Sequence, residues 1–283
     1  MKNGLVLVAL LLLTATPAFG LNHKPTFVLV HGALFTSDGW ARVESELQNA
    51  DEDVVSLNVP GRAGDGLAPK DVDLNVAVTK VCKVARTQYG PVILVGHSQG
   101  GALITQATAV CPENIKALVY VAAVVPRNRE TAFAGLTEVT RNNFGKCAIP
   151  DPENHLFRLV DDKSVLEAAF LQDVRAQDPK LADLAVASMV DEPLLIGDSP
   201  LDFPQAVFDS LPKFYVKTTR DQVVDPANQE RYISQVHMTD VYTLDASHSP
   251  FLSQPKELAK IFREISKAVI TQPSSDSRMK VAH

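Results

Sequence analysis

The sequence predicts an α/β protein in which a mostly parallel, doubly wound sheet carries an inserted helical cap. Short, nearly continuous apolar runs alternate with longer amphipathic segments, and such runs are typical of strands buried on both faces of a parallel sheet. The alternating order of strand and helix implies right-handed crossovers, which place helices on both faces. One stretch, residues 127–211, interrupts the alternation and is too long for a single crossover.

Six apolar runs are predicted to be strands. They are residues 26–32, 53–61, 91–96, 115–126, 213–219 and 240–246. Five amphipathic segments are predicted to be helices, at residues 40–48, 74–88, 99–110, 226–235 and 255–270. The last of them begins with a proline, which suits the first helical turn because the missing N–H would have no intrahelical partner there.

The interrupting stretch, residues 127–211, is predicted to be a helical cap over the carboxyl ends of the strands. It contains two segments with helical patterning, 164–174 and 179–190, joined by turns rich in proline and aspartate. The α/β core is then formed by residues 21–126 and 212–271. Residues 272–283 show no periodicity and are expected to form a flexible tail.

The first 20 residues are predicted to be a cleaved secretory signal peptide. Lys2 precedes an apolar stretch that ends in the small residues Ala18 and Gly20, as in signal peptides. The apolar run is short for a membrane span. An uncleaved anchor or a lipoprotein is the alternative, although no cysteine lies near the cleavage point. A secreted or periplasmic protein with no membrane span in its mature chain is therefore expected.

Charge and cysteine content limit the partners and the metal sites that can be expected. The net charge is −6 and no tract rich in lysine and arginine occurs, so neither nucleic acid nor an anionic membrane surface is an expected partner. The three cysteines, Cys82, Cys111 and Cys147, have no metal-ligand spacing. One disulfide with a free thiol and three buried thiols are both compatible with the sequence.

A candidate nucleophile lies between the third predicted strand and the third predicted helix. Gly96-His97-Ser98-Gln99-Gly100 matches the G-x-S-x-G nucleophile elbow in the required strand–turn–helix setting. A side chain at either glycine would collide with neighbouring backbone where the chain reverses, and the turn projects the serine outward. The following helix aims its N-terminal amides at the site, which favours developing negative charge. The alternative is an ordinary glycine-rich loop.

A serine nucleophile needs a base, and His248 has the most suitable position. It lies in a loop after the last predicted strand and before the last predicted helix, where an imidazole can reach the elbow. The other six histidines are less suitable. His23 lies near the cleavage site, His283 in the tail and His155 in the cap. His237 precedes the last predicted strand, His97 lies inside the elbow and His31 follows the first predicted strand.

The acid is expected at a strand end between the nucleophile and the base. Asp221 comes just after the fifth predicted strand and is the preferred candidate. Asp225 precedes Pro226 and is better suited to cap the following helix. Asp245, at the end of the sixth strand, is a weaker rival.

The oxyanion hole requires two backbone amides near the nucleophile. One is the amide of the next residue, Gln99. The second is expected from the loop after the first strand, where either Ala33 or Leu34 can present its N–H, and Ala33 is preferred. The bulky Leu34 and Phe35 are candidates for a wall of the substrate pocket.

With these residues placed, the chain resembles an α/β-hydrolase. It is most similar to the branch that contains plant salicylate-type methylesterases and hydroxynitrile lyases, together with small bacterial esterases. The resemblance is carried by the H-G-A segment with a downstream Trp40, the elbow, the strand leading into the cap, the acid-bearing strand end and the histidine loop with its proline-initiated helix. It implies a Ser98, Asp221, His248 triad in the order of that fold and no metal or organic cofactor.

The chain also departs from this branch. The lyases carry a lysine directly after the catalytic histidine and a threonine in the oxyanion loop, whereas this chain has Ser249 and Ala33. Cyanohydrin cleavage is therefore not expected. The aspartate that usually precedes the catalytic histidine is replaced by Ser247, and the branch is mostly cytoplasmic although this chain has an apparent export signal.

These observations predict a serine esterase that acts on small, apolar or aromatic carboxylic esters through an acyl-enzyme. Its expected partner is a small-molecule ester. A perhydrolase or haloperoxidase-like activity on the same triad, without a cofactor, is one alternative. The other is a ligand-binding receptor on a hydrolase scaffold, which would not need the strained turn.

Overall fold

The computed structural model describes residues 23–62 and 66–271. The predicted signal peptide and the predicted tail lie outside the described residues. A six-stranded sheet has the order β2-β1-β3-β4-β8-β9, and every neighbouring pair is parallel. Its strands are β1 (Thr26–Val30), β2 (Val54–Leu57), β3 (Val92–His97), β4 (Ile115–Val121), β8 (Lys213–Thr218) and β9 (Asp240–Leu244). The predicted fold class and all six strands are confirmed.

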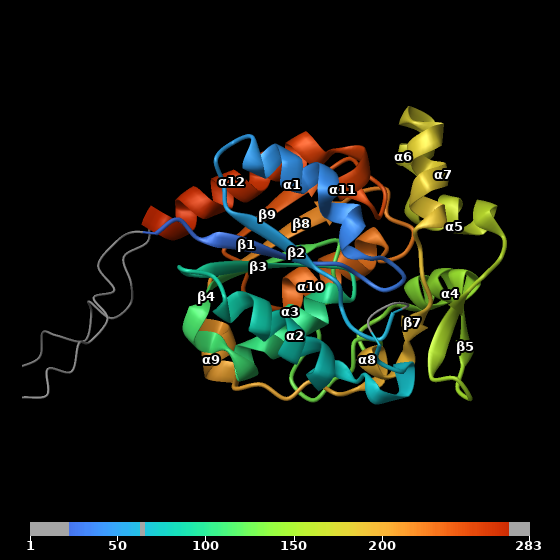
Figure 1. Ribbon diagram of the computed structural model, residues 1–283, viewed down its shortest axis with the longest axis horizontal. Helices are drawn as coiled ribbons and strands as arrows, with labels where there is room; N and C mark the ends of the chain where they lie inside the picture. The colour runs from blue at the N-terminus through green and yellow to red at the C-terminus, as the bar shows by residue number, and fades with distance from the viewer. Residues whose placement is uncertain (1–22, 63–65, 272–283) are drawn as a thin grey trace, which may run out of the picture.

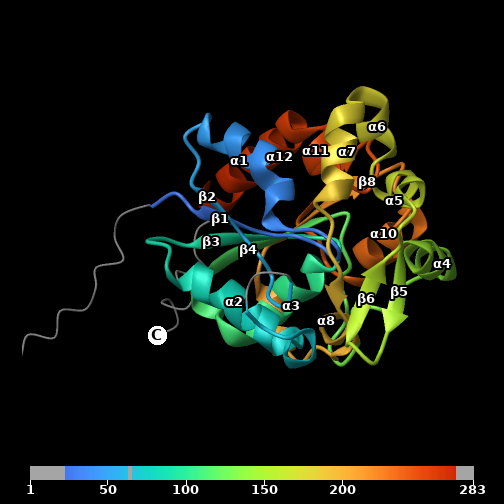
Figure 2. The same cartoon turned by 45° about the vertical axis from the view of Figure 1, so that its right-hand side comes forward.

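Helices cover both faces of the sheet (Figures 1 and 2). The face toward the top of Figure 1 carries α1 (Ala41–Gln48), α11 (Pro250–Ser253) and α12 (Pro255–Thr271), and the opposite face carries α2 (Leu74–Arg86), α3 (Gly100–Val110) and α10 (Pro226–Gln235). Side chains of β1 alternate between the two cores, since Phe27 and Leu29 belong to the first and Val28 and Val30 to the second. Burial on both faces explains why the strand has no polar alternation.

Between β4 and β8 the chain inserts residues 127–211, the stretch predicted to be the cap. Figure 1 shows the first part of this insertion, up to β7, at the right, beyond the carboxyl ends of the strands. Its helices α4 (Glu138–Cys147), α5 (Lys163–Phe170), α6 (Gln172–Gln177) and α7 (Pro179–Ala187) are joined by a small antiparallel sheet of β5 (Ala148–Asp151), β6 (Leu156–Leu159) and β7 (Glu192–Pro193). The sequence predicts only helices here, because these strands are short and two of them contain proline.

The last part of the cap returns along the core. Helices α8 (Leu194–Asp198) and α9 (Gln205–Ser210) lie beside α2 and α3, and their apolar side chains join the core of that face. Only the first part of the cap, up to β7, therefore stands over the strand ends. Among the described helices, none combines the length and the apolar character needed to cross a membrane.

A disulfide joins Cys82 of α2 to Cys111, which follows α3, with 5.7 Å between their Cα atoms. It ties together two of the helices that cover one face of the sheet, α2 and α3. Cys147 at the end of α4 is a free, buried thiol, and burial raises its pKa to about 11. This pairing resolves the question that the sequence leaves open.

Reduction of this disulfide is expected to lower the free energy of unfolding by about 3 to 4 kcal/mol, because the bond closes a loop of 29 residues and so restricts the unfolded chain. Urea unfolding with and without dithiothreitol measures the difference. The Cys82→Ser/Cys111→Ser variant serves as the control, since reductant should leave its unfolding midpoint unchanged. Equal midpoints for the oxidised and reduced wild type would contradict the expectation.

Candidate active site

Ser98 occupies a strained turn between β3 and α3. Its φ is +51°, in the left-handed region that non-glycine residues rarely adopt. A Cβ added to Gly96 would lie 2.5 Å from the Gly100 carbonyl oxygen, and one added to Gly100 would lie 2.7 Å from the Val30 carbonyl oxygen. The predicted steric need for both glycines is therefore confirmed. The Ser98 carbonyl accepts hydrogen bonds from the amides of Gly101 and Val124, which hold the turn in place.

His248 and Asp221 form a buried pair. Asp221 follows β8, His248 follows β9, and the imidazole Nδ1 lies 2.8 Å from Asp221 Oδ2. The other carboxylate oxygen, Oδ1, accepts the amides of Val223 and Val224 at 2.8 and 2.9 Å. Oδ2 also accepts the hydroxyl of Thr218 at 3.0 Å. These hydrogen bonds fix the position of the carboxylate, so Asp221 can orient the imidazole with its proton on Nδ1.

The rest of the imidazole is fixed by its neighbours. The His248 carbonyl accepts a hydrogen bond from His97 Nε2 at 2.9 Å, and the two rings lie 4.6 Å apart. Burial and repulsion from a protonated His248 hold the pKa of His97 well below its ordinary value, so His97 packs under the turn as a neutral ring. The His248 Nε2 atom is buried and has no hydrogen-bond partner among the described residues. This nitrogen is the one that could accept a proton from Ser98.

The rival candidates have other roles. Asp225 accepts the amides of Ala227 and Asn228 and caps α10, as the sequence predicts. Asp245 is exposed and pairs with Arg220. Within the described part of the chain, no three His, Cys, Asp or Glu side chains are grouped as metal ligands would be.

The loop after β1 packs directly against the elbow. A Cβ on Gly32 would lie 2.6 Å from the Ser98 Cβ, so only glycine allows this approach. The Leu34 amide already donates to Glu192 Oε2 at 3.1 Å. The amides of Ala33 and Gln99 have no acceptor within the described residues, and both residues line the cavity beside Ser98. Of the two amides that the sequence left open in this loop, the structure therefore leaves Ala33 available.

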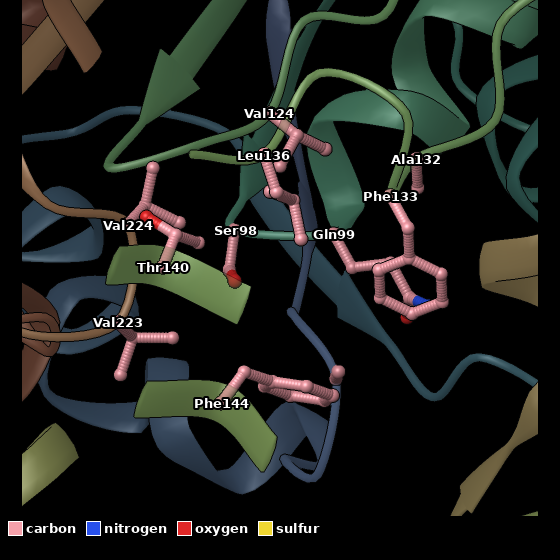
Figure 3. A pocket seen from close by; sticks show the side chains of 11 residues that line it. Ser98, Gln99, Val124, Ala132, Phe133, Leu136, Thr140, Phe144, Val223 and Val224 are labelled. Atoms are coloured by element: carbon pink, nitrogen blue, oxygen red, sulfur yellow. The ribbon is translucent and has the colours of Figure 1, made fainter. Parts of the chain in front are cut away.

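A cavity of about 30 Å³ adjoins Ser98, and its walls are almost entirely apolar (Figure 3). The lining residues come from the elbow, the oxyanion loop, the cap and the acid loop: Ala33, Ser98, Gln99, Val124, Ala132, Phe133, Leu136, Thr140, Phe144, Val223 and Val224. The Thr140 hydroxyl is engaged by Asp225, since it donates to the carboxylate at 2.7 Å and accepts the Asp225 amide at 3.2 Å. The cavity therefore offers a substrate few polar groups and no charge.

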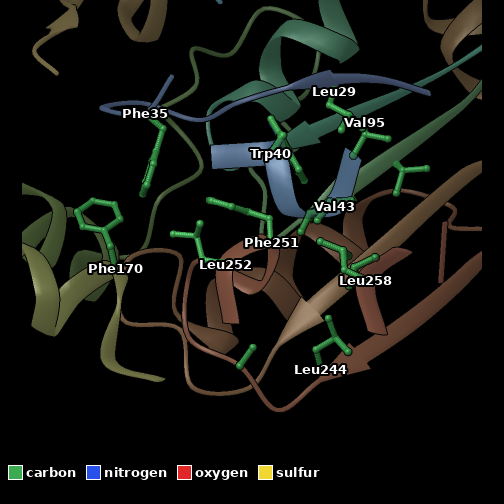
Figure 4. Close-up of a cluster of buried hydrophobic side chains, with 14 of the residues drawn as sticks. Leu29, Phe35, Trp40, Val43, Val95, Phe170, Leu244, Phe251, Leu252 and Leu258 are labelled. Carbon is green, nitrogen blue, oxygen red and sulfur yellow. The ribbon is translucent and has the colours of Figure 1, made fainter. Parts of the chain in front are cut away.

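The prediction that Leu34 and Phe35 form a wall of this pocket is wrong. Neither residue lines the cavity. Both point into the core, where Phe35 lies beside Phe170 and Phe251 (Figure 4). Leu34 itself adopts a left-handed backbone conformation, with a φ of +68°.

Sequence reasoning missed a contact between the cap and the histidine loop. Asp173 of α6 is 3% exposed and accepts the Ser247 amide at 2.9 Å as well as the Ser247 hydroxyl. The ring of Phe170 packs against His248 with 5.5 Å between centroids. No local pattern marks these cap residues. Val223 and Val224 of the pocket, by contrast, lie two and three residues after the predicted acid and could have been found.

Comparison with known proteins gives relatives of the whole fold. A sequence profile of the Alpha/beta hydrolase family matches residues 27–261. The chain is 28% identical over 259 residues to "Putative methylesterase 11, chloroplastic" of Arabidopsis thaliana, covering 87% of this chain but only 64% of that longer protein. It is 27% identical over 255 residues to pheophorbidase of Raphanus sativus, covering 85% of this chain and 94% of that protein.

Solved structures resemble the chain in fold. A pyrethroid hydrolase from Sphingobium faniae JZ-2 superposes with a TM-score of 0.76 at 23% identity, over 86% of this chain and 98% of that one. An extracellular alpha/beta-hydrolase from a Paenibacillus species superposes with a TM-score of 0.73 at 21% identity, over 85% and 98% of the two chains. At such identities the likeness concerns the fold alone.

Proposed function

This chain belongs to the alpha/beta hydrolase family, and we propose that it is a serine hydrolase of small, uncharged carboxylic esters. The observation that carries the proposal is the buried His248–Asp221 pair next to a serine on a strained elbow. The His248 ring lies 4.6 Å from the ring of His97, the residue before Ser98, and its Nε2 has no hydrogen-bond partner among the described residues. The relatives named methylesterase and pheophorbidase give independent support for ester chemistry.

The acylation step uses five residues. Ser98 Oγ attacks the acyl carbon of the ester while His248 Nε2 takes the hydroxyl proton. Asp221 keeps the other imidazole proton on Nδ1 and stabilises the imidazolium that forms. The amides of Ala33 and Gln99 donate to the oxyanion of the tetrahedral intermediate. As the intermediate collapses, the imidazolium gives its proton to the leaving alkoxide, and an alcohol departs.

Hydrolysis of the acyl-enzyme repeats these roles with water. His248 Nε2 removes a proton from a water molecule, which attacks the acyl carbon, and the same two amides stabilise the second oxyanion. Collapse breaks the bond to Ser98 Oγ, which recovers its proton from His248 and releases the carboxylic acid. One base thus serves both half-reactions.

The proposed substrate class follows from the pocket walls. Phe133, Leu136 and Phe144 of the cap face Ser98 across the cavity (Figure 3). A charged group on the substrate would lose its hydration there without gaining a counter-charge, which is strongly unfavourable. The site therefore favours alkyl and aromatic esters over charged ones.

We further propose that the protein works outside the reducing cytoplasm. The Cys82–Cys111 disulfide would persist in an oxidising compartment. Export directed by the predicted signal peptide would deliver the protein to such a compartment. Detection of the processed chain in the culture medium or periplasm tests this.

A fluorophosphonate probe tests the proposed activity. We expect one adduct per chain, located on the peptide that contains Ser98, and turnover of p-nitrophenyl butyrate. Its kcat/KM should exceed that of p-nitrophenyl hemisuccinate by roughly 100-fold, because the carboxylate of the latter cannot be paired in the pocket. Absence of an adduct would overturn the serine-hydrolase proposal. An adduct without turnover of either ester would exclude ester hydrolysis, and equal rates would exclude the substrate class.

A further inference from the structure

The oxyanion loop is strained at the residue after its proposed donor. Leu34 has a φ of +68° although it carries a side chain, and such a conformation persists only when its surroundings impose it. Both backbone groups of Leu34 are held by the cap. Its amide donates to Glu192 Oε2 at 3.1 Å, and its carbonyl accepts the amide of Val190 at 3.0 Å.

Glu192 is in turn fixed by an ion pair. Its carboxylate is fully buried and accepts a hydrogen bond from the guanidinium of Arg62, whose side chain is 5% exposed. Arg62 also donates to the carbonyl of Val59 at 2.9 Å. Burial raises the pKa of Glu192, and the neighbouring guanidinium opposes this rise.

The same loop is held from its other side. The amide of Val59 donates to His31 Nε2 at 3.0 Å, and His31 Nδ1 lies 2.8 Å from the Gly32 carbonyl. Burial keeps the pKa of His31 well below its ordinary value, which leaves the ring neutral and able to accept at Nε2. Residues on both sides of Ala33 are thus hydrogen-bonded within one buried network.

We propose that Glu192 is a positioning residue of the oxyanion hole, which occupies the Leu34 amide and thereby directs the Ala33 amide toward the substrate. The proposal rests on the proposed function, since it assigns Glu192 a role in ester hydrolysis. Glu192 does not touch the substrate. Its carboxylate holds the strained turn, and the turn sets the direction of the neighbouring N–H.

A pair of double variants separates this role from simple neutralisation of Arg62. Glu192→Gln alone would leave a buried guanidinium without a counter-charge and would destabilise the fold. Arg62→Met/Glu192→Gln removes the charge but keeps an oxygen that can accept the Leu34 amide. Arg62→Met/Glu192→Met removes both the charge and the acceptor. The two proteins should unfold at similar temperatures.

With p-nitrophenyl butyrate, we expect the methionine variant to have a kcat about 30-fold lower than the glutamine variant, with KM within about threefold, because misdirecting one donor forfeits much of the roughly 10²-fold that a donor supplies. Inhibition by a trifluoromethyl ketone, which forms a tetrahedral oxyanion on serine, should weaken in parallel. Equal kcat values in two folded variants would overturn the proposal.

Amide hydrogen exchange provides a readout that does not depend on turnover. A peptide spanning residues 31–35 should exchange faster in the methionine variant than in the glutamine variant, and equal exchange would also overturn the proposal. If the wild type hydrolyses no ester, the proposed function fails. Faster exchange of the peptide in the methionine variant would then show only that Glu192 holds the loop at Leu34. Glu167→Gln is the control, since Glu167 pairs with Arg175 at the cap surface and should alter neither kcat nor exchange of this peptide.

Discussion

Replacement of Ser98 by alanine is expected to lower kcat/KM for p-nitrophenyl butyrate by about 10⁴- to 10⁶-fold, as loss of a triad nucleophile does in other serine hydrolases. The variant should fold, because alanine fits the same space and its backbone meets the same left-handed turn. Any remaining rate would come from the oxyanion amides and from substrate binding. The change is measured from the rate of p-nitrophenolate release by the two proteins, with the wild-type concentration set by active-site titration.

A matched serine supplies the control for this variant. The Ser188 hydroxyl donates to the Ala185 carbonyl at the end of α7, in the cap but away from the cavity. Ser188→Ala should retain a kcat/KM within about twofold of the wild type, as expected for a substitution away from the site. If Ser98→Ala kept more than a tenth of the activity, Ser98 would not be the nucleophile.

Replacement of Asp221 by asparagine is expected to lower kcat by about 10⁴-fold. The amides of Val223 and Val224 both donate to Oδ1, so the single amide oxygen of asparagine will take that place. Its NH₂ group then faces His248 Nδ1 and selects the tautomer that carries the proton on Nε2. An Nε2–H cannot accept the proton of Ser98, and the base is lost although its position is kept.

Asp245→Asn is the matched control for the acid. Asp245 lies close in sequence to the base, but its side chain is 78% exposed and pairs with Arg220. Its kcat should stay within about twofold of the wild type, since an exposed ion pair contributes little. If Asp245→Asn lost more activity than Asp221→Asn, the assignment of the acid would be wrong.

Most of the core could be predicted from the sequence because its signals are local. The strands β1, β3 and β4 are buried along almost their whole length and appear as continuous apolar runs. The helix α10 is preceded by Asp225 and begins at Pro226, as capping rules require. The small sheet of the cap could not be predicted, because β5 contains Pro150 and β7 is two residues long. Its pairing is set by tertiary contacts and not by side-chain alternation.

The candidate triad could also be read from the sequence, since the end of each parallel strand reaches the same edge and the residues follow a fixed order. Side-chain direction in the oxyanion loop could not. Leu34 and Phe35 were expected in the pocket, yet both are buried in the core at a left-handed turn. The contact that holds this turn joins residues 158 positions apart, Leu34 and Glu192, and no local pattern encodes such a distance.

The hydrogen bonds between Ser247 and Asp173 have a consequence for protein engineering. Exchange of cap segments between related hydrolases is an obvious way to change the substrate range while the core is left unchanged. In this chain the Asp173 carboxylate of the cap accepts hydrogen bonds from Ser247 in the loop that carries His248. A grafted cap without an equivalent of Asp173 would therefore leave the Ser247 amide without its partner. In a cap exchange, residues 173 and 247 should therefore be taken together from the same parent protein.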